Sequence, residues 1–170
     1  ARGSLGVPWD EVLERVPPDQ VATYAGGAMA QLDDNGNGGL LGYRHQGKRI
    51  TSKHLAMGLG EMAADFTNAY VLGSVGQTGH NMGACATFLY NLRLAVQDIR
   101  EGRARVALVG GVDTPLLPDV MDGLATMGAL ATDASLLEIE GKSAGETPDH
   151  RRACRPFGLN SGFVVGEGAQ

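Results

Sequence analysis

Cysteine is scarce in this sequence, which contains only Cys85 and Cys154 among its 170 residues. The two cysteines lie far apart, and neither belongs to a CxxC motif or to a His/Cys spacing that is typical of a zinc site. This scarcity excludes the disulfide framework that holds many small secreted domains together. We therefore expect reduced thiols, a cytoplasmic location and no bound metal.

The sequence also lacks a long apolar run and an excess of basic residues. No stretch approaches the roughly 18 apolar residues that span a bilayer, and no basic-then-apolar leader opens the sequence. The 14 Lys and Arg residues stand against 19 Asp and Glu, and the basic residues cluster only at 149–155. The formal charge of −5 disfavours nucleic acid as a partner, and membrane insertion is not expected.

Glycine, by contrast, is abundant, with 26 residues and no repeating period. Because glycine tolerates backbone conformations that other residues avoid, this abundance indicates tight turns and close backbone contacts. Hydrophobic residues make up 43% of the chain, which is enough to fill the core of one domain.

The order of the predicted elements is that of an α/β fold. We expect helices at 9–15 and 52–66, a loop at 33–42, and strands at 21–27, 69–75 and 105–111. A further amphipathic helix should follow Cys85 and end near Gly102, with one apolar face made of Phe88, Leu92, Ala95, Val96 and Ile99. The strand–turn–helix–strand order predicts a parallel sheet covered on both faces. Residues 133–152 are polar and should form a surface insertion.

The position of Cys85 allows two interpretations. If a strand ends near Gly83 and a helix begins at Ala86, the thiol lies at the positive end of the helix dipole, which favours the thiolate. A thiolate there could attack an acyl carbonyl, and the backbone N–H of Cys85 could stabilise the resulting oxyanion. The alternative is an inert core cysteine, which the local pattern alone favours.

Three segments carry a family resemblance when they are taken in order. They are "GACATFLYNLRLAVQDIREGRARVALVGGVD" (83–113), "MGALAT" (127–132) and "RPFGLNSGFVVGEGA" (155–169). Together they resemble the β-ketoacyl-acyl carrier protein synthases, which are condensing enzymes of the thiolase fold. The resemblance implies a mixed sheet with helices on both faces, and it implies that residues 1–170 are a partial N-terminal half of such an enzyme.

The resemblance also implies a reaction and its participants. Cys85 would take an acyl group from a thioester of acyl carrier protein or coenzyme A, and malonyl-carrier protein would then condense with it by losing carbon dioxide. The family implies a homodimer, no cofactor, and a place for Met127 near the acyl pocket, although plain helix packing is an equal alternative for Met127. The pathway would be fatty acid or polyketide synthesis.

The departures from the family pattern limit what this chain can do alone. Gly158 replaces the usual aspartate, no arginine precedes Gly162, and the two catalytic histidines of the family's second half are absent. The four histidines present favour surface or supporting roles: His45, His54, His80 and His150. Two alternatives stay open for the fragment, namely a non-catalytic dimerising or interaction fragment, or a cysteine acyl hydrolase.

Overall fold

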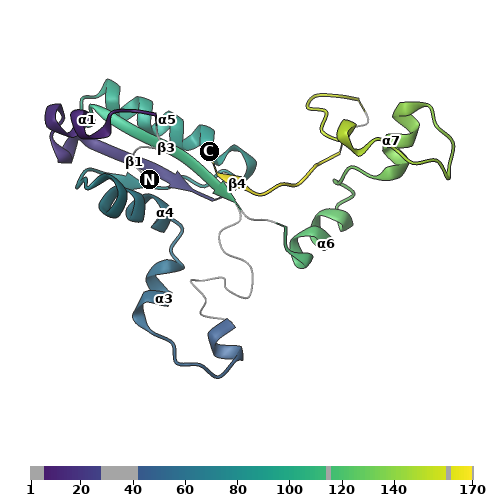
Figure 1. Cartoon of the computed structure of the whole chain (residues 1–170), viewed down its shortest axis with the longest axis horizontal. Helices are drawn as coiled ribbons and strands as arrows, with labels where there is room; N and C mark the ends of the chain where they lie inside the picture. Colours follow the sequence, from purple (N-terminus) through teal and green to yellow (C-terminus); the bar gives the residue numbers. More distant parts are fainter. Residues whose placement is uncertain (1–5, 28–41, 114–115, 160–161, 170) are drawn as a thin grey trace. The chain divides into compact units, whose positions relative to one another are not determined.

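The computed structural model describes residues 6–27, 42–113, 116–159 and 162–169. The chain divides into two compact units, which are residues 1–113 with 168–170, and residues 114–167 (Figure 1). The loop predicted at 33–42 falls outside the described residues except for Gly42. Within the described residues, no helix is both long and apolar enough to cross a membrane.

A four-stranded sheet forms the centre of the first unit. Strand β1 (Val21–Gly26) pairs in parallel with β2 (Thr78–Gly79) on one side and with β3 (Val106–Asp113) on the other. A short antiparallel strand, β4 (Gly168–Ala169), joins β3 at its far end, so the strand order is β2-β1-β3-β4. The mixed sheet and the predicted strands 21–27 and 105–111 are thereby confirmed.

Alternating residues of β1 and β3 build a separate core on each face of the sheet. On one face, Val21 packs with Leu72 and Trp9. On the other face, Ala22 and Tyr24 pack with Ala95. The side chains of a strand point alternately to opposite faces, and here both faces are covered by helices, as expected for a mainly parallel sheet.

Helix α1 (Trp9–Arg15) has the bounds that the sequence predicted. It follows Pro8, which suits the start of a helix because the missing N–H would have no partner there. Trp9 is buried, and its indole N–H donates a hydrogen bond to the carbonyl of Leu72 at 3.4 Å. This contact attaches the helix to the first of the two cores.

The prediction for residues 52–75 was wrong in two respects. The single expected helix is two, α3 (Ser52–Met57) and α4 (Met62–Phe66), separated by a segment that contains Gly58 and Gly60. The expected strand at 69–75 is instead a π-helix, η3 (Thr67–Leu72), which continues α4. Apolar runs of this length suit a strand or a helix equally, and contacts with β1 decide between them.

Asn68 explains why η3 is stable at this place. Its side-chain carbonyl accepts a hydrogen bond from the Thr23 hydroxyl of β1 at 2.9 Å, and its amide donates to the carbonyls of Ser74 and Gly76. One buried amide therefore connects the helix, the central strand and the loop that follows.

Helix α5 (Thr87–Arg100) covers the second face of the sheet, as predicted, and ends before Gly102, whose φ is +74°. The rotation of the helix differs from the one that its apolar positions predict. Its buried residues are Thr87, Asn91, Ala95 and Asp98. Of the predicted apolar face only Ala95 is buried, whereas Phe88, Leu92, Val96 and Ile99 are exposed. At 100° per residue, the buried side is centred roughly 100° from the apolar one.

A polar network beneath α5 accounts for this rotation. The buried Tyr24 hydroxyl donates to the Asp98 carboxylate, and the Arg103 guanidinium donates to the same carboxylate at 2.8 Å. Burial alone would raise the pKa of Asp98, but the hydrogen bonds from Tyr24 and Arg103 hold it below the usual value. Burial and the adjacent carboxylate raise the pKa of Tyr24 far above its ordinary range.

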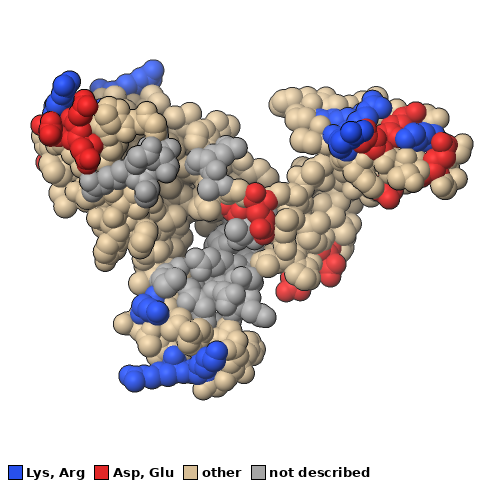
Figure 2. All heavy atoms as spheres, viewed as in Figure 1, with Lys and Arg blue, Asp and Glu red and all other residues tan. Residues whose placement is uncertain are grey.

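The second unit contains α6 (Pro118–Thr126), α7 (Asp133–Glu140) and the short 3-10 helix η5 (His150–Arg152). The Thr132 side chain caps α7 by accepting the N–H of Ser135. The basic stretch at 149–155 does not form a uniformly positive surface, because Arg151 pairs with Asp149 at 2.8 Å. Figure 2 shows acidic atoms among the basic ones of this unit.

We predict that Asp98→Asn lowers the free energy of unfolding at pH 7 by about 2 kcal/mol, because a buried charge-assisted hydrogen bond contributes roughly that much. The folded-state pKa of Asp98 lies below the unfolded value of about 3.9. The stability that the ionised carboxylate contributes is therefore fully present above about pH 3.9, and it is lost as the pH falls through the folded-state pKa. Urea titrations between pH 7 and pH 2 should show that the free energy of unfolding falls less steeply with decreasing pH in the variant than in the original protein.

The matched control for Asp98→Asn is Glu101→Gln, which removes an exposed carboxylate that also contacts Arg103. Exposed ion pairs contribute about 0–1 kcal/mol, so this change should have little effect. Equal losses in the two variants would contradict the importance of the buried network.

A second prediction compares two glycines. A Cβ at Gly76 would lie 2.0 Å from the backbone carbonyl oxygen of Val21, so Gly76→Ala must displace the loop from β1. We expect a loss of about 2–3 kcal/mol, as for other overpacked sites. Gly123 lies within α6, and a Cβ there would meet no neighbouring atom within 4 Å, so Gly123→Ala should gain about 0.5–1 kcal/mol from helix propensity. Chemical denaturation followed by circular dichroism measures the free energy of unfolding of both variants. An unchanged stability of Gly76→Ala would refute the close contact between Gly76 and the Val21 carbonyl.

Candidate active site

Cys85 lies just before the start of α5, as the sequence predicted, but the preceding strand, β2, ends at Gly79 and not near Gly83. It occupies the middle of a 3-10 turn, η4 (Ala84–Ala86), that leads directly into the helix at Thr87. Its thiol is free and its side chain is exposed. The 14 residues of α5 place the positive end of a helix dipole at this turn, which favours negative charge there.

The backbone of the turn is unusual at the residue before the cysteine. Ala84 has a φ of +49°, in the left-handed region that residues with a side chain rarely adopt. The hydroxyl of Thr87 donates to the Ala84 carbonyl at 2.6 Å and accepts the N–H of Gly83 at 3.2 Å. These two bonds hold the strained residue from both sides.

The neighbourhood of the turn is closely packed on the helix side. A Cβ at Gly83 would lie 2.1 Å from the ring of Tyr90, so no larger residue fits there without displacing that ring. Asn91 is 0% exposed, and its side-chain carbonyl accepts the N–H of Asn81 at 2.8 Å. The segment from Asn81 to Cys85 is therefore anchored at several points on α5.

His80 is packed against the end of β1. A Cβ at Gly26 would lie 2.1 Å from its ring, so the imidazole occupies space that glycine leaves open. Both ring nitrogens are buried, and neither has a hydrogen-bond partner among the residues that the structure describes. The sequence favoured a surface or supporting role for this residue, and no catalytic partner for it is observed in the described part of the chain.

Two of the other histidines have local partners. His54 is buried, and its Nδ1 lies 2.8 Å from the Thr51 hydroxyl at the start of α3. His150 pairs with Asp133 at 2.9 Å on the exposed surface of the second unit. Across the described ranges, no three His, Cys, Asp or Glu side chains gather in a way that could hold a metal ion.

The remaining predicted residues belong to the second unit. Met127 lies directly after α6, and 74% of its surface is exposed. Cys154 follows η5 and is a free, exposed thiol like Cys85. Unlike Cys85, it is not placed at the start of a long helix. The geometry alone leaves the roles of Met127 and Cys85 as predictions.

Sequence reasoning missed Thr87 and Asn91. Both lie on the buried side of α5, four residues apart, and both bond to the segment that precedes Cys85. The signal was available, because Thr87, Asn91 and Asp98 recur at helical spacing on one side of the helix and so indicate a second, polar candidate for its buried side.

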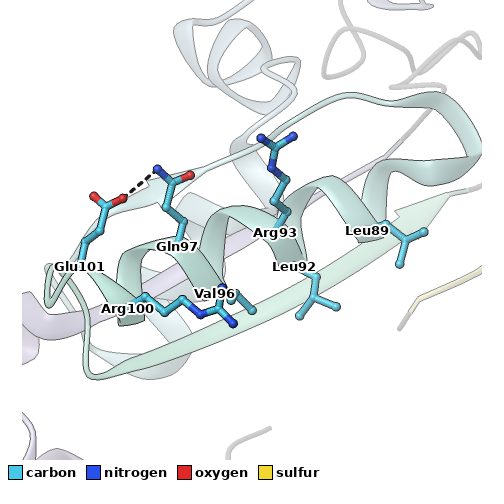
Figure 3. Close-up of a pocket in the computed structure, with 7 residues that line it drawn as sticks. All are labelled: Leu89, Leu92, Arg93, Val96, Gln97, Arg100 and Glu101. Carbon is cyan, nitrogen blue, oxygen red and sulfur yellow. Dashed lines mark hydrogen bonds between the residues drawn. The ribbon is translucent and has the colours of Figure 1, made fainter.

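An open hollow follows the outward side of α5. Figure 3 shows Leu89, Leu92 and Val96 along one side of the helix. The polar lining includes Gln97 and Glu101, whose side chains are joined by a hydrogen bond of 2.9 Å. The hollow therefore lies over the exposed apolar positions of α5, away from the sheet.

Comparison with known proteins identifies the family. Residues 11–170 match the family model described as "Beta-ketoacyl synthase, N-terminal domain", so the chain belongs to the β-ketoacyl synthase family. It is 49% identical over 167 residues to the β-ketoacyl-[acyl-carrier-protein] synthase FabY of Pseudomonas aeruginosa, covering 98% of this chain and 26% of that protein. The resemblance inferred from the sequence motifs is confirmed.

Other relatives and a solved structure agree with this assignment. The 3-oxoacyl-[acyl-carrier-protein] synthase 2 of Staphylococcus aureus is 31% identical over 99 residues, covering 58% of this chain and 21% of that protein. The crystal structure of the noncanonical ketosynthase FabY from P. aeruginosa matches with a TM-score of 0.81 over 96% of this chain and 25% of that one. The α/β, thiolase-like fold is thereby confirmed, and the chain spans about a quarter of the length of FabY.

Proposed function

We propose that this chain is the N-terminal part of a β-ketoacyl-acyl carrier protein synthase and that Cys85 accepts the acyl group. The observation that carries the proposal is the exposed thiol of Cys85 at the N-terminal turn of α5, in a chain 49% identical to a synthase of this kind. The positive end of the helix dipole supports a thiolate at this position.

The first half-reaction uses groups that this chain holds. The Cys85 sulfur attacks the carbonyl carbon of an acyl thioester, and a tetrahedral oxyanion forms. The backbone N–H of Cys85 is a donor for this oxyanion. Collapse of the intermediate expels the thiol of coenzyme A or of the carrier protein's phosphopantetheine, which takes up the proton, and leaves the acyl group on Cys85.

The second half-reaction forms the carbon–carbon bond. Malonyl-carrier protein loses carbon dioxide, and the carbanion that remains attacks the carbonyl of the acyl-enzyme. The bond to the Cys85 sulfur breaks, and a β-ketoacyl-carrier protein leaves. The family resemblance assigns polarisation of the malonyl thioester to two histidines outside residues 1–170, so this chain alone should not condense.

Several finer points belong to the same proposal. Met127 is proposed to line the acyl pocket, which is consistent with an exposed, flexible apolar side chain next to α6. Residues 133–152, which include α7, are proposed as a surface insertion on the ketosynthase half. Acyl carrier protein is the proposed partner, since FabY is named as a carrier-protein synthase. The two free thiols support a cytoplasmic setting.

We also propose that the full-length protein is a homodimer that pairs its sheets near β3. This strand bonds to β4 only at Val112 and Asp113, so within the described residues its outer edge at 106–111 carries no strand. An open edge of this length is a template for pairing with another chain.

The assembly proposal predicts a dimer at micromolar concentration. Sedimentation velocity on the full-length protein should show a single species of twice the monomer mass that persists on tenfold dilution. A monomer throughout that range would contradict the proposed pairing.

The proposed chemistry predicts different behaviour for the two cysteines. Incubation of residues 1–170 with acetyl-CoA should give a slow acyl adduct on Cys85, because the family resemblance assigns the second oxyanion donor to a glycine-rich segment outside these residues, and loss of one such donor typically costs about 10²–10³-fold in rate. Intact-mass spectrometry and peptide mapping locate the adduct. Cys154→Ser should leave it unchanged, whereas Cys85→Ser should abolish it, and iodoacetamide should label Cys85 first.

Addition of malonyl-carrier protein to the acylated chain tests whether residues 1–170 can carry out the second half-reaction. We expect no β-ketoacyl product from residues 1–170. Steady formation of β-ketoacyl product by residues 1–170 would refute the assignment of the two catalytic histidines to the rest of the protein. Full synthase activity in a full-length Cys85→Ser variant would refute the role of Cys85.

A further inference from the structure

We propose that Thr87 is a positioning residue that aims the backbone N–H of Cys85 at the oxyanion. The inference rests on the proposed role of Cys85 as the acyl acceptor. It assigns a function to a side chain that the substrate does not need to touch, and it follows from the way a single hydroxyl is bonded.

The argument begins with the peptide group between Ala84 and Cys85. The carbonyl of Ala84 and the N–H of Cys85 belong to the same planar trans unit, so they point in opposite directions and rotate together. The Thr87 hydroxyl donates to that carbonyl at 2.6 Å, and the backbone N–H of Thr87 donates to the same oxygen. By holding the carbonyl on the helix side, Thr87 turns the N–H of Cys85 away from the helix side of the turn.

The second bond of Thr87 fixes the preceding peptide. Its oxygen accepts the N–H of Gly83 at 3.2 Å, so one hydroxyl bridges the two peptide groups that flank the left-handed Ala84. A residue with a side chain leaves such a conformation readily unless its surroundings impose it. Thr87 is 4% exposed, which protects both bonds from competition by water.

Asn91 supports the same segment one helical turn further on. It is fully buried, and it accepts the N–H of Asn81 at 2.8 Å, which anchors the chain four residues before Cys85. Its amide nitrogen is buried without a hydrogen-bond partner among the described residues. A buried unpaired donor lowers stability, so Asn91 suits the anchoring of this loop better than it suits plain core packing.

The test uses Thr87→Val in the full-length protein, because valine keeps the shape of threonine and removes both side-chain hydrogen bonds, while the backbone N–H of Thr87 still donates to the Ala84 carbonyl. We expect the rate of Cys85 acylation by acetyl-CoA to fall at least about tenfold with little change in KM. The reason is that the backbone N–H of Cys85, which would lose its alignment, stabilises the oxyanion and not the bound substrate. Thr87→Ser, which keeps the hydroxyl, should restore most of the rate.

Alkylation of Cys85 by iodoacetamide separates this role from a structural one. Alkylation forms no oxyanion, so Thr87→Val should change it by less than about threefold, with Cys154 labelling in the same molecule as the internal reference. General loosening of the fold would alter alkylation and acylation together. Thr126→Val is the control for loss of an exposed hydroxyl: the Thr126 hydroxyl also donates to a backbone carbonyl, that of Asp122, at 2.8 Å, and its removal should change neither rate.

Each outcome is decisive. Acylation of Thr87→Val at the unaltered rate, or an equal loss of acylation and alkylation, would overturn the positioning role. Should Thr87→Val fail to fold, Thr87→Ala removes the same bonds without adding a methyl group, and the same comparison applies. Full activity of Cys85→Ser would instead overturn the proposed function, so the two failures are distinguishable.

Discussion

Burial of β1 on both faces is the constraint on which the rest of the first unit depends. The four residues from Val21 to Tyr24 are at most 1% exposed, and two of them carry hydroxyl groups that water does not reach. The Thr23 hydroxyl finds its partner in Asn68 on one face, and the Tyr24 hydroxyl finds its partner in Asp98 on the other. A buried hydroxyl without a partner is costly, so these two adjacent residues fix η3 and α5 against opposite faces of the sheet.

The bond between Tyr24 and Asp98 also accounts for the surface that α5 presents. With Asp98 turned toward the sheet, the residues three, seven and eleven positions before it also lie on the buried side, and they include Asn91 and Thr87. The apolar stripe of Leu89, Leu92 and Val96 is then left exposed along the hollow. The side of the helix that packs is thus the one that carries Thr87, Asn91 and Asp98, while Arg93 and Arg100 stay exposed. This rotation brings Thr87 against the turn of Cys85.

Part of the candidate site could be predicted because it is local in the sequence. The turn at Cys85 and the helix after it depend on neighbouring residues, and the motifs around them were specific enough to indicate the family that the comparisons confirm. The two bonds of Thr87 could not be predicted in this way. A threonine in the first turn of a helix is ordinary, and the direction of its hydroxyl depends on the left-handed conformation of Ala84, which no propensity indicates for alanine.

The sequence by itself determined the elements whose periodicity fits only one kind of structure. Helix α1, strand β1, helix α5 and strand β3 follow from local apolar spacing, from a proline before a helix and from a glycine after one. Only the tertiary structure decided the state of residues 69–72 and the rotation of α5. A short apolar run can be a strand or a helix, and an amphipathic helix can be turned by a single buried charge. In both cases the deciding partner, Thr23 for Asn68 and Tyr24 for Asp98, lies more than 40 residues away in the chain, because β1 must satisfy its own buried hydroxyls.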